Sequence, residues 1–262
     1  MRLIFIRHGE PDYNSDVLTQ KGRLDAELLA KRVKKWNVDR VYVSPMGRAQ
    51  ETAAPSLLAL NMEAETLDWL REFSHQVVNP THGNKSVCWD YAPSVWADNP
   101  VMYTRNEWLD IEPCVSVPAL KEQYLAATKG IDEIIAGYGY ERHGNYYINS
   151  KNPKNRDIVS TVINKNTHYA NTLPDEDAGE TVVFFCHFGI TCLLLSHLLN
   201  LPFNALTHGT LIPCTGVTIV TTEERWKNEA YFRMQTLGDV SHLLSEGVSV
   251  SSAGSFAPLF QG

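Results

Sequence analysis

The sequence lacks the patterns that mark several large classes of protein. Its five cysteines are an odd number and form no CxxC pair, so a disulfide framework is not expected and a reducing compartment fits best. The apolar run that opens the chain is too short for a signal peptide or a membrane span and ends at Arg7. We therefore expect a cytoplasmic protein with no membrane partner.

An excess of positive charge is also missing. The net charge is −7 and the isoelectric point is about 5.7, which argues against nucleic acid as the main partner. Nine histidines are present, but there is neither an HExxH motif nor a Cys/His spacing typical of metal ligands. We expect no metal and no cofactor. A small basic pocket for a phosphorylated metabolite is still compatible with an acidic surface.

What the sequence does contain is an alternation of strand-like and helix-like segments. Apolar runs predict strands, and apolar residues recurring every three to four positions predict helices that cover them. This rhythm predicts an α/β fold, a three-layer α/β/α sandwich with a mostly parallel central sheet. We also expect Ser44-Pro45 to open a helix, as N-cap and first helical residue. The expected strands are 3–6, 41–43, 181–186, 216–221 and 231–236, and the main expected helices are 26–36, 118–136 and 190–199.

We expect residues 1–262 to form a single domain interrupted by two excursions. Residues 74–117 are irregular and rich in tryptophan and tyrosine, and we interpret them as an inserted cap. Residues 138–180 are polar and rich in asparagine, which is typical of a second surface excursion. The segment after Ser245 is rich in serine and glycine, so we expect it to be loosely held.

Three short segments place reactive side chains at the same topological position. Arg7-His8-Gly9 follows the first strand, Ser44 to Arg48 follows the second, and His187-Phe188-Gly189 joins a later strand to a helix. Ligands of open α/β sheets bind beyond the carboxyl ends of the strands. Neighbouring strands would therefore bring these turns into one pocket, where arginines offer forked donors and a helix start offers backbone N–H groups to a phosphate.

A second copy of the tripeptide, Arg142-His143-Gly144, does not share this context. No apolar strand precedes it, so we assign it to a surface hairpin without a catalytic role. We likewise interpret His197, His242 and Cys186 as structural, because apolar neighbours favour an inert thiol at Cys186.

On these motifs the sequence resembles the histidine phosphatase superfamily, which includes the cofactor-dependent phosphoglycerate mutases. The resemblance covers roughly residues 1–73 and 181–242. The segments that match are Arg7-His8-Gly9-Glu10 with Asn14, Leu18 to Gly22, Ser44-Pro45 with Arg48, Ala49 and Thr52, Leu70-Arg71-Glu72, and Cys186 to Gly189.

The resemblance implies a role for each matching position. His8 would be the nucleophile that forms a phosphohistidine, and Glu72 would be the proton donor. The residues implied in phosphate binding are Arg7, Asn14, Arg48, His187 and Phe188. After Glu72 the sequence departs from the family pattern, which leaves His75 or Asp90 as alternative donors.

The residue types agree with this chemistry. Arginines near His8 disfavour its charged form and lower its pKa, which keeps a ring nitrogen unprotonated for attack. We expect a metal-independent phosphatase acting on a small phosphomonoester. A mutase is the alternative, disfavoured because Tyr13 replaces the tryptophan that mutases usually carry before the asparagine. A non-catalytic domain that binds a phosphorylated ligand is a third. The aromatic residues at 89–108 fit either a lid core or a substrate pocket, and nothing in the sequence indicates the oligomeric state.

Overall fold

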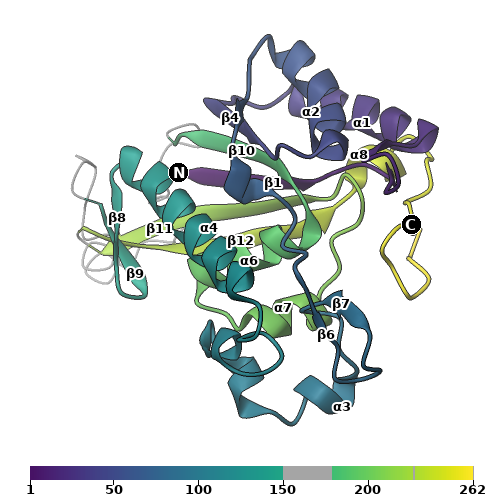
Figure 1. Ribbon diagram of the computed structural model, residues 1–262. Helices are drawn as coiled ribbons and strands as arrows, with labels where there is room; N and C mark the ends of the chain where they lie inside the picture. Colours follow the sequence, from purple (N-terminus) through teal and green to yellow (C-terminus); the bar gives the residue numbers. More distant parts are fainter. Residues whose placement is uncertain (150–178, 227, 262) are drawn as a thin grey trace.

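A computed structural model describes residues 1–149, 179–226 and 228–261. Within these residues the fold centres on an eight-stranded sheet with strand order β5-β4-β10-β1-β11-β12-β9-β8 (Figure 1). The sheet strands are β1 (Arg2–Arg7), β4 (Arg40–Val43), β5 (Glu65–Thr66), β8 (Tyr140–His143), β9 (Tyr146–Asn149), β10 (Thr181–Cys186), β11 (Val217–Trp226) and β12 (Glu229–Asp239).

The remaining elements are helices and two small hairpins. The α-helices are α1 (Gln20–Val33), α2 (Gly47–Leu60), α3 (Pro93–Trp96), α4 (Pro118–Gly137), α6 (Phe188–Leu199), α7 (Phe203–Gly209) and α8 (Ser241–Leu244). Three 3-10 turns are η1 (Asp68–Leu70), η2 (Pro100–Tyr103) and η3 (Glu107–Asp110). The hairpins pair β2 (Pro11–Asp12) with β3 (Val17–Leu18), and β6 (Gln76–Val78) with β7 (Lys85–Val87).

The sheet is mostly parallel, as the sequence predicts. Strands β5, β4, β10 and β1 pair in parallel, whereas β11, β12, β9 and β8 extend the sheet by antiparallel pairing. Strands β9 and β11 therefore run against the other six. The parallel half has its carboxyl ends along one edge, which is the edge where a ligand site is expected.

Helices cover both faces of the sheet because side chains alternate along each strand. In β1, Ile4 and Ile6 pack with α1 and α2, whereas Leu3 and Phe5 face the core beneath α4 and α6. Figure 1 shows α1 and α2 above the sheet and α4 and α6 on its other side. The fully buried β10 and the nearly all-buried α6 lie at the centre, and the predicted three-layer arrangement is confirmed.

The start of α2 differs from the sequence prediction. Ser44 and Pro45 do not open this helix; its N-cap is Met46 and its first residue is Gly47. The backbone at Gly47 approaches Asp16 so closely that a Cβ would lie 2.3 Å from the Asp16 carbonyl oxygen. This approach requires glycine at the helix start, and it leaves the Ser44 hydroxyl available for another partner.

The 74–117 region lies beside α7, at the lower edge of the molecule in Figure 1. Trp108 of this region is fully buried and stacks on Phe203 with ring centroids 4.7 Å apart. Of the 138–180 region, the described part contains the hairpin β8–β9, which extends the central sheet. The second Arg-His-Gly copy lies in this hairpin, as predicted; residues 150–178 lie outside the described residues.

The segment after Ser245 is held more firmly than we expected from its composition. Lys21 and Glu10 both make hydrogen bonds to it, so the expectation of a loosely held tail is wrong for residues 249–254. Composition predicts mobility only where no partner exists, and here the partners come from the other end of the chain.

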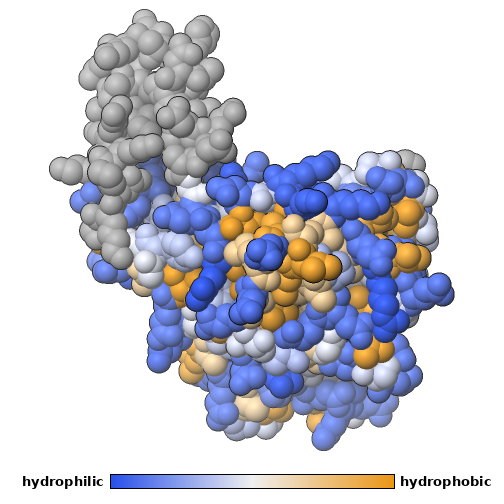
Figure 2. Space-filling view, turned by 90° about the horizontal axis from the view of Figure 1, so that it is seen from above, coloured by the Kyte–Doolittle hydropathy of each residue, from blue (hydrophilic) through white to orange (hydrophobic). Residues whose placement is uncertain are grey.

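The molecular surface mixes hydrophilic and apolar areas. Seen from the side of α1 and α2, it is mainly hydrophilic with an apolar area near its centre (Figure 2). Leu58 of α2 is among the exposed apolar side chains. No helix in the described part of the chain is long and apolar enough to cross a membrane.

Candidate active site

The three predicted turns meet because their strands are neighbours. Strand β10 lies between β1 and β4, with Arg7 opposite Cys186 and Phe185 opposite Val43. The residues that follow these strand ends are His8, His187 and Ser44. The rings of His8 and His187 lie with their centroids 5.2 Å apart, so the expected convergence is present.

His8 is oriented by its own neighbour in the chain. Its Nδ1 lies 2.7 Å from the Gly9 carbonyl oxygen, and because a carbonyl can only accept, Nδ1 carries the proton. The other ring nitrogen, Nε2, is then left with a lone pair. Burial lowers the pKa of His8 well below its usual value, and the charges of Arg7 and Arg48 lower it further. The ring is therefore neutral and has the tautomer that a nucleophile needs.

Arg7 is buried, and its charge is not neutralised. Its Nη1 donates to the Ile212 carbonyl oxygen at 2.7 Å and its Nη2 to that of Ala253 at 3.2 Å. Within the described ranges Arg7 has no carboxylate partner at ion-pair distance. Carbonyl oxygens orient a guanidinium without cancelling its charge, so Arg7 keeps its attraction for an anion.

Arg48, from the first turn of α2, is anchored differently. It forms an ion pair and hydrogen bond with Asp16, and the same carboxylate accepts the Gly47 N–H at 2.7 Å. Its guanidinium also lies over the Tyr13 ring, 5.6 Å from the centroid. Arg48 is 6% exposed, so the pair with Asp16 fixes it at the pocket rather than leaving it in solvent.

His187 is the N-cap residue of α6 and is fully buried. Its Nε2 lies 2.8 Å from the Ser44 hydroxyl oxygen. Ser44, which does not cap α2, therefore holds the His187 ring. Burial lowers the pKa of His187 well below its usual value, with His8 and Arg48 adding to the effect. Because Nε2 has this contact, Nδ1 is the ring nitrogen that remains for another partner.

Three buried nitrogen atoms of this cluster have no hydrogen-bond partner among the described residues. They are Nε of Arg7, Nε of Arg48 and Nδ1 of His187. Buried polar groups are nearly always hydrogen-bonded, so such a group calls for a ligand, an ion or a water molecule. Nitrogen atoms of two arginines and a histidine in one cluster suit the oxygens of a phosphate group.

Glu72 lies at the N-terminus of α6. Its Oε1 accepts the N–H groups of Ile190 at 3.0 Å and Phe73 at 2.8 Å. The helix start therefore already has an acidic partner, and of the N–H groups that we expected to meet a phosphate near Gly189, that of Ile190 is occupied by Glu72. Both bonds fall on Oε1, so Oε2 is the oxygen left for proton transfer.

A cavity of about 330 Å³ opens beside Glu72. Met46 connects it to the histidine cluster, because its sulfur lies 3.6 Å from Nη2 of Arg48 and 3.4 Å from the Glu72 nitrogen. His75, one of the alternative donors, lines this cavity, and Asp90, the other, does not. The cavity is lined by Met46, Asp68, Arg71, Glu72, Ser74, His75 and Gln123.

The two other predicted phosphate ligands, Asn14 and Phe188, differ in their relation to this cluster. Asn14 lies in an exposed turn, where its backbone N–H donates to Asp12, and its side chain makes no hydrogen bond within the described residues. Phe188 packs against the site: the Arg7 guanidinium lies 6.0 Å from its ring centroid, and Trp89 meets it edge-on.

The residues that we interpreted as structural have structural partners. His197 is hydrogen-bonded to Asp132 at 2.8 Å, and His242 to Thr215 at 3.0 Å. Burial raises the pKa of Cys186 to about 12, so its thiol stays protonated. Within the part of the chain described here, no group of three His, Cys, Asp or Glu side chains is arranged to hold a metal ion.

Sequence reasoning missed two residues that hold the cluster in place. Asp16 fixes Arg48, and Ser44 fixes His187. Asp16 has a positive φ of 53°, which no local pattern indicates. Ser44 was misread as a helix cap because Ser-Pro before a helix usually has that role.

Comparison with known proteins agrees with this geometry. The model of the histidine phosphatase superfamily (branch 1) matches residues 3–91. A Schizosaccharomyces pombe protein named a probable phosphatase is 38% identical over 66 residues, which are 22% of this chain and 32% of that protein. Phosphoserine phosphatase 1 of Hydrogenobacter thermophilus is 30% identical over 84 residues, 29% of this chain and 40% of that protein. The chain thus spans well under half of the length of these two relatives.

Solved structures share the fold over most of the chain. The mycobacterial glucosyl-3-phosphoglycerate phosphatase superposes with a TM-score of 0.53 at 16% identity, covering 90% of this chain and 98% of that one. A phosphoserine phosphatase variant of Entamoeba histolytica in complex with phosphoserine gives 0.53 at 17% identity, covering 92% and 98%. The resemblance to the histidine phosphatase superfamily is confirmed by the matched segment and the shared fold.

Proposed function

Since residues 3–91 match the histidine phosphatase superfamily (branch 1), we propose that this chain is a phosphatase that hydrolyses a small phosphomonoester through a phosphohistidine on His8. The observation that carries the proposal is the set of buried nitrogen atoms of Arg7, Arg48 and His187 around the neutral His8 ring, none of which has a hydrogen-bond partner among the described residues. The names of the relatives, two of which act on phosphoserine or a phosphoglycerate derivative, support a small phosphorylated metabolite.

The first half of the reaction transfers the phosphoryl group to the enzyme. Nε2 of His8 attacks phosphorus, the ester P–O bond breaks, and Oε2 of Glu72 gives its proton to the leaving oxygen. The two arginines and His187 stabilise the charge on the three transferring oxygens, which is usually the largest contribution to catalysis of this kind. The products of this half are the alcohol and a phosphohistidine.

The second half returns the enzyme to its starting state. Water attacks the phosphohistidine and loses a proton to Glu72, and the P–N bond breaks to release inorganic phosphate and neutral His8. The cavity beside Glu72 has room for the leaving group and then for this water. Its polar lining favours a hydrophilic leaving group.

A labelling experiment tests the proposal. The chain is mixed with a ³²P-labelled ester, quenched in alkaline detergent to preserve phosphohistidine, and compared with His8→Ala. We expect label on the wild type and none on His8→Ala. His143→Ala is the matched control, because His143 has the same Arg-His-Gly context but lies exposed on β8, and it should label like the wild type.

The same assay separates the alternatives. Release of inorganic phosphate from a panel of esters supports a phosphatase. Isomerisation of phosphoglycerate without phosphate release would replace it with a mutase. Phosphate binding without label or turnover would indicate a non-catalytic binding domain.

A further inference from the structure

The segment 249–254, which we call the C-terminal strap, contacts the site from the far end of the sequence. The Ala253 carbonyl oxygen accepts a hydrogen bond from Nη2 of Arg7 at 3.2 Å, across 246 residues of chain. We infer that the strap is a positioning element that holds Arg7 in its phosphate-binding orientation. This inference rests on the proposed function, because it assigns the strap to the phosphate pocket.

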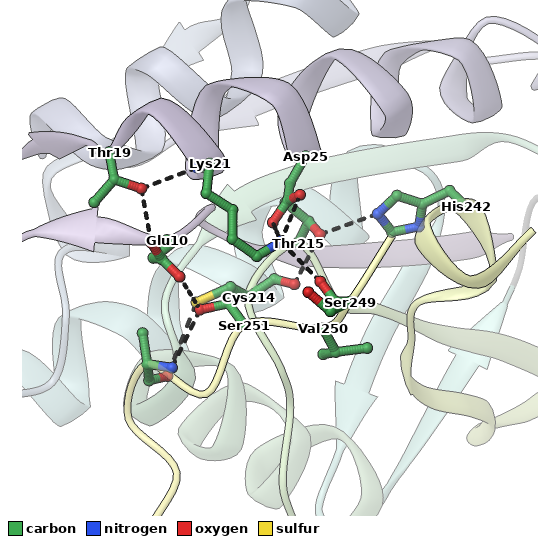
Figure 3. A network of polar contacts seen from close by, with 12 residues as sticks. Glu10, Thr19, Lys21, Asp25, Cys214, Thr215, His242, Ser249, Val250 and Ser251 are labelled. Carbon is green, nitrogen blue, oxygen red and sulfur yellow. Dashed lines mark hydrogen bonds and ion pairs between the residues drawn. The ribbon is translucent and has the colours of Figure 1, made fainter. Parts of the chain in front are cut away.

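The strap is anchored to the loop that carries the nucleophile. The Ser251 hydroxyl donates to Oε2 of Glu10 at 2.6 Å and accepts the Ala253 N–H at 3.2 Å. The other oxygen of Glu10 accepts from the Thr19 hydroxyl at 2.9 Å. Glu10 lies two residues after His8, so one carboxylate ties the strap to the His8 loop and to the start of α1 (Figure 3).

A second anchor lies at Lys21, the second residue of α1. Nζ of Lys21 donates to the Ser249 carbonyl oxygen at 2.7 Å and pairs with the fully buried Asp25 at 2.9 Å. Figure 3 shows Lys21 reaching from α1 toward Ser249, with Glu10 and Ser251 meeting nearby. The contacts of Ser249 and Ser251, on either side of Val250, restrict where the Ala253 carbonyl can point.

Gly254 permits the close approach that the contact needs. Its φ is +75°, and a Cβ at this position would lie 2.7 Å from Nη2 of Arg7. Any other residue would displace the guanidinium or the strap. Gly247 offers a matched comparison, since its φ is +68° but a Cβ there would meet nothing within 4 Å.

The nature of the contact favours a role in positioning. A carbonyl oxygen holds one N–H of Arg7 and leaves its net charge for an anion, whereas a carboxylate would compete with phosphate. The carbonyl oxygens of Ile212 and Ala253 each accept a hydrogen bond from one Nη atom of Arg7. The guanidinium is then fixed while its buried Nε has no partner within the described residues.

The test compares Gly254→Ala with Gly247→Ala in the full chain. Binding of inorganic phosphate is measured by titration calorimetry, and thermal unfolding is measured in parallel. Both variants carry the same strain of a positive φ, so we expect similar losses in melting temperature. We expect phosphate affinity to fall about tenfold in Gly254→Ala, the scale of one charge-assisted hydrogen bond, and to stay within about twofold in Gly247→Ala.

The Gly254→Ala substitution is then repeated in an Arg7→Lys variant, to show whether its effect on phosphate affinity depends on Arg7. In Arg7→Lys, the Gly254→Ala change should reduce phosphate affinity no further, because coupled positions are not additive. Equal affinity losses in the two glycine variants, or full additivity with Arg7→Lys, would overturn the strap's role while leaving phosphate binding and the proposed function intact. A wild-type chain that binds no phosphate would overturn both.

Discussion

The two histidines of the candidate site are each held through a different ring nitrogen. His8 is fixed through Nδ1 by the carbonyl of its own neighbour Gly9, and His187 through Nε2 by the Ser44 hydroxyl. In both rings burial favours the neutral form. A small number of local contacts therefore sets which nitrogen atom of each ring can meet a phosphate.

These depressed pKa values predict how stability depends on pH. In the unfolded chain both histidines bind a proton near pH 6.5, whereas in the folded chain they stay neutral to a much lower pH. The unfolded state therefore binds more protons below pH 6.5, and the free energy of unfolding falls as the pH is lowered from 6.5. Above pH 6.5 this contribution is complete. Denaturant unfolding at pH 7.5, 6 and 5 measures it, and His8→Gln should flatten the slope; an unchanged slope would contradict it.

Removing the Ser44 hydroxyl should affect stability and activity together. Ser44→Ala leaves a buried nitrogen of His187 without its partner, which costs about 1–3 kcal/mol of unfolding free energy. We also expect kcat/KM to fall about tenfold, because the ring is no longer held in one orientation. Thermal unfolding and steady-state kinetics measure the two effects.

A neighbouring serine provides the control for Ser44. Ser56 on α2 is fully buried, but its hydroxyl has no partner within the described ranges. Ser56→Ala should therefore cost much less stability and leave kinetics unchanged. Equal behaviour of the two variants would show that the bond to His187 is not important.

Among secondary-structure elements, α6 connects catalysis to folding most directly. It starts with His187, and its first turn is capped by Oε1 of Glu72. A carboxylate at a helix N-terminus stabilises the helix through its N–H groups and dipole. The same side chain therefore has a structural oxygen, Oε1, and an oxygen available for chemistry, Oε2.

Two substitutions of Glu72 separate these roles. Glu72→Gln keeps an oxygen that accepts the Ile190 N–H but cannot donate as an acid, so stability should stay near the wild type while kcat falls about 10²–10⁴-fold. Glu72→Ala should lose the same activity and, in addition, about 0.5–2 kcal/mol of stability. Full activity in Glu72→Gln would show that Glu72 is not the proton donor and would favour His75, which lines the same cavity.

The elements that place the site could be predicted from the sequence, but the contacts that orient its side chains could not. Apolar runs revealed β1, β4 and β10, and polar residues after each run indicated one pocket. The Asp16–Arg48 pair, the Ser44–His187 bond and the strap depend on backbone turns and on residues up to 246 positions apart. Periodicity carries no information about such contacts. The local composition of 249–254 therefore wrongly predicted a loosely held segment.

The molecule as a whole joins a sheet-based core to an aromatic-rich region. In that region Trp96 stacks on His208 of α7 with centroids 4.4 Å apart, and it also contacts Tyr103. The cavity beside Glu72 is lined by none of the aromatic residues at 89–108. These contacts favour packing, rather than substrate selection, as the role of Trp96.

Replacing Trp96 should therefore destabilise the protein without changing its preference among substrates. Trp96→Ala removes a half-buried ring and should cost about 1–3 kcal/mol of unfolding free energy. The ranking of phosphate esters by kcat/KM should match that of the wild type at a temperature where both are folded. A reordered ranking with unchanged stability would place Trp96 at the substrate instead.

The long separation between Arg7 and its carbonyl partners has a consequence for synthesis. A ribosome makes Arg7 before the backbone oxygens that orient it, which come 205 and 246 residues later. A nascent chain can pair β1 with β10 before Ala253 has been translated. A chain terminated upstream of that codon would thus contain most of the residues of the hydrophobic core but would lack one of the two carbonyl oxygens that hold the Arg7 guanidinium.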